Sequence, residues 1–205
     1  MPYRNITFQR IMHTITSTSF LVIFTALSWT IAAASDRSDA TTLREKCEAE
    51  FKHLEIVVKN FGSESDVSGL QKGIDLLKTG KVKLAQSKYL DAKAIYNDYL
   101  KLQSEIYKSL ASSYSARTEA MINEITAELV DFLDNEKISQ YFRLAAQNLN
   151  DAKSSEKGER YKMAVDLCRN AKKFVIDSYK QAGKNVPDKY RKDAKDNDKQ
   201  IYTEK

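Results

Sequence analysis

The sequence predicts an all-α protein, an elongated antiparallel helical bundle that follows an N-terminal signal peptide. Between Gly80 and Gly158 the chain contains neither glycine nor proline, whereas a β-fold needs turn residues about every 8–12 positions. Apolar residues recur three and four positions apart, which is the spacing of one helix face. Good helix formers such as Ala, Leu, Lys, Glu and Gln dominate the same stretch.

The N-terminal residues have the pattern of a secretory signal. Residues 1–19 carry two arginines and no acid, residues 20–31 are almost entirely apolar, and three alanines precede a charged stretch. This order is typical of a signal peptide, so we expect cleavage between Ala34 and Ser35 and export to the periplasm or beyond the cell. The alternative is an uncleaved anchor over residues 14–34. The chain then divides into a signal peptide (1–34), a helical domain (35–183) and a charged, loosely ordered tail (184–205).

Five helical segments are expected after the signal. Their approximate ranges are 39–61, 66–79, a long tract from Gly80 to about 134 (one helix or two near-collinear ones), 136–155 and 159–182. Gly62 and Gly183 provide natural C-terminal stops. A short helix after Pro187 is expected within the tail.

A spacing of small and large residues runs through the second segment and the start of the long tract. Its members are Leu70, Gly73, Leu76, Gly80, Val82, Ala85, Tyr89 and Ala92. The pattern resembles a tetratricopeptide repeat, which implies a helical hairpin that turns at Gly80 and packs closely through Gly73, Ala85 and Ala92. A weaker second copy, 79 residues later, places Ala164, Cys168 and Ala171 at the positions of Ala85, Tyr89 and Ala92. Alternatively, any antiparallel hairpin favours glycine in its turn and alanine where helices cross.

Charge and cysteine content restrict the function further. Residues 35–205 hold 31 Lys and Arg against 28 Asp and Glu, and the two signs are interleaved. This balance predicts solvated helix faces rather than a nucleic-acid partner. Cys47 and Cys168 both lie on apolar helical stripes, so they are either buried thiols or, in an exported protein, a disulfide.

Few residues in the chain have catalytic or metal-binding potential. His53 is the only histidine after the signal, and its place on a helix predicts a structural role. The chain has no phosphate-binding loop, zinc-binding helix or calcium loop, so we expect no cofactor, no metal and no enzymatic activity. A row of tyrosines along the long helix forms either the edge of the core or a partner groove: Tyr89, Tyr96, Tyr99, Tyr107 and Tyr114.

These observations predict a non-enzymatic exported protein that binds another protein in the cell envelope, with membrane contact only through the signal segment. One alternative is a carrier that holds a small apolar ligand between its helices. The other is a weak binder of anionic envelope polymers or lipids through the basic tail.

Overall fold

The computed structural model describes residues 35–204, which are helical with no strand among them. The first helix covers residues 35–61. The remaining elements are α2 (Glu64–Ala85), α3 (Tyr89–Glu128), the 3-10 helix η1 (Val130–Phe132), α4 (Glu136–Lys157), α5 (Tyr161–Gln181), the 3-10 helix η2 (Asp188–Tyr190) and α6 (Arg191–Asn197). The prediction of an all-α fold is therefore confirmed for this part of the chain. The signal peptide and its cleavage after Ala34 concern residues outside the described range.

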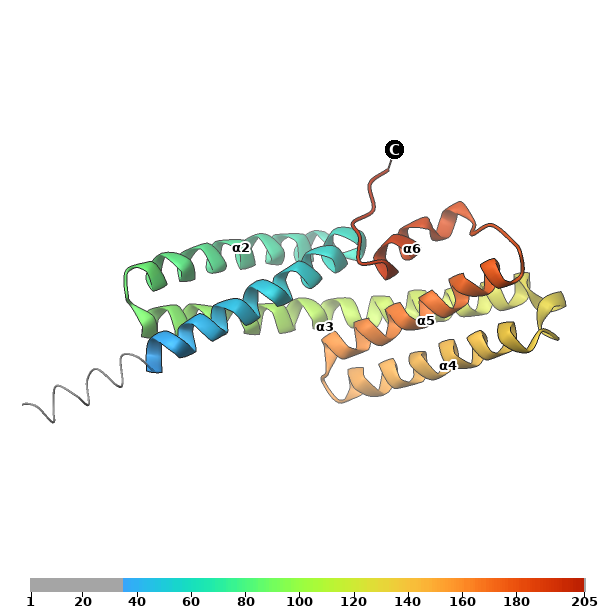
Figure 1. Ribbon diagram of the computed structural model, residues 1–205, viewed down its shortest axis with the longest axis horizontal. Helices are drawn as coiled ribbons and strands as arrows, with labels where there is room; N and C mark the ends of the chain where they lie inside the picture. Colours follow the sequence, from blue (N-terminus) through green and yellow to red (C-terminus); the bar gives the residue numbers. More distant parts are fainter. Residues whose placement is uncertain (1–34, 205) are drawn as a thin grey trace, which may run out of the picture.

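Helix α3 is the spine of the molecule. Its 40 residues span about 60 Å at 1.5 Å per residue, as one continuous helix. The first helix and α2 pack along its N-terminal part, and the α4–α5 hairpin packs along its C-terminal part (Figure 1). Three apolar clusters follow one another along this spine, centred on Tyr96, Leu110 and Ile125.

Side chains explain where two of the helices begin. Ser63 and Asp66 form a capping box that starts α2, and the Asn135 side chain accepts from two backbone N–H groups at the start of α4. Gly183, with φ of 69°, follows the end of α5. The expected ends of the first helix, α4 and α5 agree with the structure to within a few residues.

The turn expected at Gly80 is wrong. Helix α2 continues through Gly80 to Ala85, and the chain turns at residues 86–88 instead. Glycine is needed here for close approach rather than for a turn, because a Cβ on Gly80 would lie 2.6 Å from Cε1 of Tyr96 on α3. Gly73 meets the Tyr99 ring in the same way, at 3.2 Å.

The alanines expected at close crossings divide into two groups. Ala92, Ala164 and Ala171 are fully buried, as their proposed packing role requires. Ala85 is exposed, so it does not hold two helices together.

The two hairpins have the same turn, in a different register from the one expected. Ser87 between α2 and α3 has φ of 58°, and Glu159 between α4 and α5 has φ of 57°. The residue after each bonds to the carbonyl five positions earlier, Lys88 to Lys83 and Arg160 to Ser155. The turns therefore correspond at a spacing of 72 residues, not 79.

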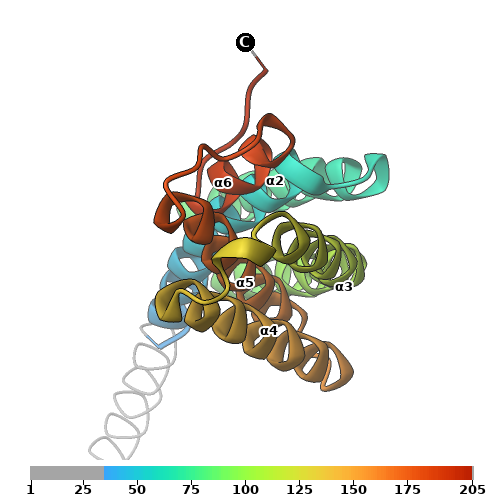
Figure 2. The same ribbon diagram turned by 90° about the vertical axis from the view of Figure 1, so that its right-hand side faces the viewer.

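The segment expected to be a loosely ordered tail is packed against the bundle. It contains the short helix expected after Pro187, and η2 and α6 lie over α5 beside the C-terminal end of the first helix (Figures 1 and 2). Tyr190 enters the apolar cluster around Ile125. Asp193 and Asp196 are completely buried. Their burial could not be predicted from a charged, lysine-rich sequence.

Candidate functional site

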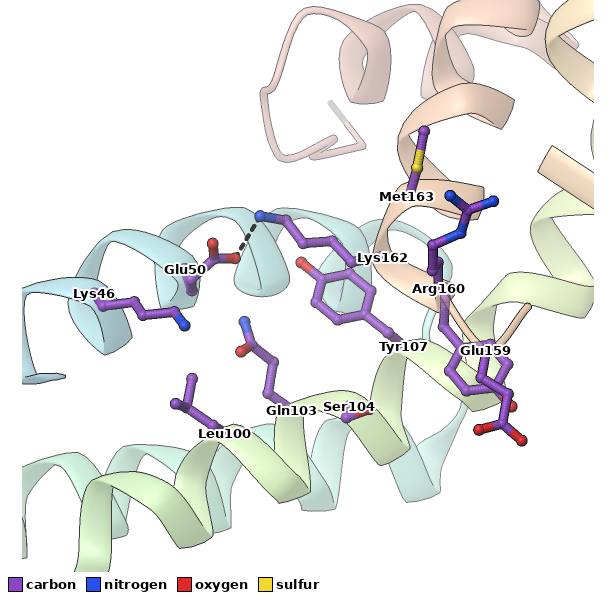
Figure 3. Close-up of a pocket in the computed structure, with 11 residues that line it drawn as sticks. Lys46, Glu50, Leu100, Gln103, Ser104, Tyr107, Glu159, Arg160, Lys162 and Met163 are labelled. Atoms are coloured by element: carbon purple, nitrogen blue, oxygen red, sulfur yellow. Dashed lines mark ion pairs between the residues drawn. The ribbon is translucent and has the colours of Figure 1, made fainter. Parts of the chain in front are cut away.

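A surface groove opens where the α4–α5 hairpin ends against the first helix and α3. Its volume is about 450 Å³. We call it the α5 groove, because residues 159–163, which lead into α5 and form its first turn, make up one of its sides (Figure 3). It is lined by Lys46 and Glu50 of the first helix, Leu100, Gln103, Ser104 and Tyr107 of α3, and residues 159–163.

The groove combines apolar walls with paired and unpaired charges. Leu100, Tyr161 and Met163 supply apolar surface, and Met163 is 47% exposed. Lys162 forms an ion pair with Glu50 across the groove, which ties α5 to the first helix (Figure 3). Lys46 forms no ion pair with any residue of the range 35–204.

Gln103 is a buried polar residue without a full set of partners. Its side chain is 6% exposed, and its Nε2 finds no hydrogen-bond acceptor among the described residues. Leaving a buried donor unsatisfied costs about 1–3 kcal/mol. The amide extends from α3 into the groove, on the side of Lys46 and Glu50 (Figure 3). Gln103 is one of the residues that line the groove.

The start of α5 has no side-chain cap, a feature it shares with α3 and α6. Arg160 occupies the capping position and accepts no hydrogen bond through its side chain, and the first turn contains no acidic residue. Helices α2 and α4 both have a polar cap and an acid in the first turn. The first backbone N–H groups of a helix have no partner within the helix, and they carry the positive end of its dipole. This end of α5 is therefore suited to a negatively charged or acceptor group.

A polar cluster lies behind the groove. The Tyr107 hydroxyl hydrogen-bonds to Nδ1 of His53, and Nε2 of His53 lies 2.8 Å from Asp166 and 2.7 Å from the Arg169 guanidinium. Nε2 can either donate to Asp166 or accept from Arg169, but not both at once. Burial acts to raise the pKa of Asp166, but the hydrogen bond and charge of His53 outweigh it, and this pKa lies below its usual value.

The His53 cluster fits the structural role expected from the sequence. Tyr107 is almost completely buried, and burial raises its pKa well above the ordinary value. A protonated tyrosine that already bonds to His53 is poorly placed to act as a nucleophile or base. The cluster holds Tyr107 in place at the back of the α5 groove.

A second charged cluster fixes α6. Lys172 of α5 is completely buried and lies 3.0 Å from Asp193 and 3.3 Å from Asp196. Arg117 of α3 pairs with Asp193, and Arg169 pairs with Asp196. These charges are directed at one another and not at solvent, so the cluster serves the fold.

The tyrosine row is a core element rather than a groove. Tyr96, Tyr99, Tyr107 and Tyr114 are each at most 2% exposed, and Tyr89 is half-buried. Of the five, Tyr107 is the one that lines the α5 groove. Tyr96, Tyr99, Tyr107 and Tyr114 therefore belong to the core, in line with the first of the two interpretations.

The two cysteines are buried free thiols. Cys47 belongs to the apolar cluster around Tyr96, and Cys168 belongs to the cluster around Leu110. Burial raises the pKa of Cys47 to about 11, so its thiol stays protonated and unreactive. Within residues 35–204 no group of three or more His, Cys, Asp or Glu side chains is placed to hold a metal ion.

Comparison with protein-family models, curated proteins and solved structures gives no match. No helix in the described part of the chain has the length and apolar character needed to cross a membrane.

The groove residues were not identified from the sequence, although one signal was present. The apolar stripe of α3 runs through Tyr96, Tyr99, Ile106 and Leu110, and Gln103 lies on this same buried face. A polar side chain at a core position indicates either a buried hydrogen-bond network or a binding site. Lys46, Glu50 and Lys162 gave no such signal, because charged residues are common throughout the chain.

Proposed function

We propose that this chain is an exported, non-enzymatic helical protein that binds another protein in the cell envelope, and that the α5 groove is its contact surface. The observation that carries the proposal is the groove itself, which joins three helices and is lined by the exposed Met163 together with Leu100 and Tyr161. Apolar side chains surrounded by charged ones are characteristic of protein-binding surfaces. Export rests on the pattern of residues 1–34.

The shape of the molecule supports a binding role. The described helices form an elongated body around α3, which belongs to the α2–α3 hairpin and also packs against the α4–α5 hairpin (Figure 1). The groove lies at the turn of the α4–α5 hairpin, and the ion pair between Glu50 and Lys162 ties the two halves together there. A partner seated in the groove contacts both halves of the molecule at once.

A small-molecule carrier is the second candidate, and one observation favours it. Gln103 offers an unsatisfied donor inside a groove of about 450 Å³, which lies within the usual range for a small ligand. The tyrosine rim expected for such a carrier reduces to Tyr107 and Tyr161.

Binding of anionic polymers by the basic tail has less support. Lys189 is paired with Glu124 and Glu128, and the tail's own Asp193 and Asp196 are buried against α5. Lys189 and the two buried acids of the tail are therefore engaged with the bundle.

Site-specific photo-crosslinking in the native host tests the proposal. A benzoylphenylalanine at Met163, in the groove, should give a crosslinked product of defined mass. The matched control is the same substitution at Val130, which is 58% exposed on η1, away from the groove. Equal products from both positions, or a product from Val130 alone, would show that the groove is not the contact surface.

A further inference from the structure

We infer that the α5 groove binds a carboxylate joined to an apolar group. The inference concerns the chemistry of the bound group, so it does not depend on whether a protein or a small molecule supplies that group. Two independent observations point to it: the uncapped start of α5 and the unpartnered amide of Gln103.

Several donors of the groove have no partner among the described residues. The first-turn backbone N–H groups of α5 lack a capping side chain, Gln103 offers Nε2, and Lys46 offers an ammonium group that forms no ion pair within residues 35–204. Acceptor oxygens with negative charge satisfy all three kinds of donor. A carboxylate provides two such oxygens.

The acids of the groove do not oppose this assignment. The charge of Glu50 is offset by its ion pair with Lys162, although its buried Oε2 has no hydrogen-bond partner among the described residues. The Glu159 carboxylate points away from Gln103 and Lys46 (Figure 3). The remaining charges that line the groove, Lys46 and Arg160, are positive.

The apolar walls define the second half of the ligand. Leu100, Tyr161 and Met163 lie in the same groove as the donors. An apolar group bound there gains about 25 cal/mol for each Å² that it removes from water. Inorganic phosphate or a short hydrophilic acid lacks this contribution. An apolar carboxylic acid and a polypeptide C-terminus that ends in an apolar residue both fit.

Calorimetry with two pairs of probes tests the inference on the purified chain. The first pair is octanoate and octan-1-ol, and the second is the peptide acetyl-Ala-Ala-Ala-Leu with a free carboxylate and with a C-terminal amide. In at least one pair the acid should bind about tenfold more tightly than its neutral counterpart. Preference for octanoate identifies a free acid as the source, and preference for the peptide acid identifies a polypeptide C-terminus. Equal binding of acid and neutral probe in both pairs overturns the inference.

Two variants locate the binding in the groove. Gln103→Met should abolish most of the preference for the acid while leaving the free energy of unfolding unchanged or raised, because it removes an unsatisfied donor. Lys46→Gln, on an exposed side chain that carries little folding risk, should reduce the affinity for the acid but not for the neutral probe. Lys72→Gln on the exposed face of α2 is the control. An acid preference that survives in both groove variants overturns the assignment.

This experiment separates the inference from the proposed function. Crosslinking from Met163 that persists in the Gln103→Met variant, together with no acid preference in calorimetry, would leave a protein contact without a carboxylate. Acid binding without any crosslink from Met163 would support the carboxylate site and contradict the protein partner.

Discussion

A single missing methyl group at Gly80 sets the distance between α2 and α3. The Tyr96 ring, which is fully buried, occupies the space that a Cβ on Gly80 would take. Helix α2 accepts glycine in its interior at a cost of about 1 kcal/mol in helix propensity, and the packing of a tyrosine ring offsets this cost.

Replacing Gly80 by alanine should therefore destabilise the protein by up to about 2 kcal/mol. Overpacking costs about 1–3 kcal/mol, and the gain in helix propensity offsets about 1 kcal/mol of this loss. Urea unfolding followed by circular dichroism measures the change. The control is Gly158→Ala at the end of α4, where the nearest atom would be 3.5 Å from the new Cβ. A Gly80→Ala variant as stable as Gly158→Ala would contradict this packing account.

The sequence shows where the small residues lie but not which side chains pack against them. Glycine before a run of helix formers favours a turn, and this is how Gly80 was interpreted. The interpretation fails because the packing partner, Tyr96, lies sixteen residues away on another helix. A local sequence pattern carries no information about such a tertiary contact. The same limit applies to Gln103, whose unsatisfied amide emerges only when three helices meet.

At the scale of elements, α6 shows how a charged segment can become part of a core. It has only seven residues, too few for a stable isolated helix. Lys172, Arg117 and Arg169 on longer helices supply the positive charges that Asp193 and Asp196 need. Asn60 adds hydrogen bonds to Asp196, to the backbone of Gln200 and to the backbone of Tyr202, which joins the first helix to the C-terminal segment.

Removing the Asp193 charge should strongly destabilise the protein. We expect Asp193→Asn to cost about 3–5 kcal/mol, because it leaves Lys172 and Arg117 with one carboxylate fewer in a buried site. The matched control is Asp198→Asn, an exposed acid one turn further along, with an effect within about 0.5 kcal/mol. Urea unfolding at neutral pH compares the two. Similar midpoints for both variants would show that α6 is not held by this cluster.

The effect of Asp193→Asn on the free energy of unfolding should also depend on pH, with a defined sign. Burial alone would raise the pKa of Asp193, but its hydrogen bond from Arg117 and the charge of Lys172 lower this pKa below the usual value. A carboxylate with a lowered folded-state pKa stabilises the protein above its unfolded-state pKa of about 3.9, and this contribution disappears as the pH falls through the folded-state value. The stability difference between wild type and Asp193→Asn should stay constant above about pH 5 and shrink below about pH 4.

Helix boundaries were the more predictable part of the element scale. Where a cap or a stop residue is local, as at Phe61, Asn135 and Gly183, sequence and structure agree. The first helix, however, already includes residue 35, whereas its expected start is near residue 39. Asp36 and Asp39 pair with Lys93 of α3, and these ion pairs hold the additional turn against the bundle.

On the scale of the whole molecule, the longer helices pack against α3 in two groups, one along each half of its length. The first helix and α2 occupy one half, and α4 and α5 occupy the other (Figure 1). An all-α bundle follows from the 3.6-residue periodicity of the sequence, so it could be predicted. The placement of the second hairpin part-way along α3 could not, and this placement creates the α5 groove.

Hydrogen exchange of the full chain, alone and with the partner identified by crosslinking, tests the central claim that the α5 groove is the binding surface. The account predicts slower exchange of backbone amides on binding in residues 46–50, 100–107 and 159–163, with little change at residues 64–85 and 130–136. Protection confined to those last two ranges, with the groove residues unchanged, would contradict it.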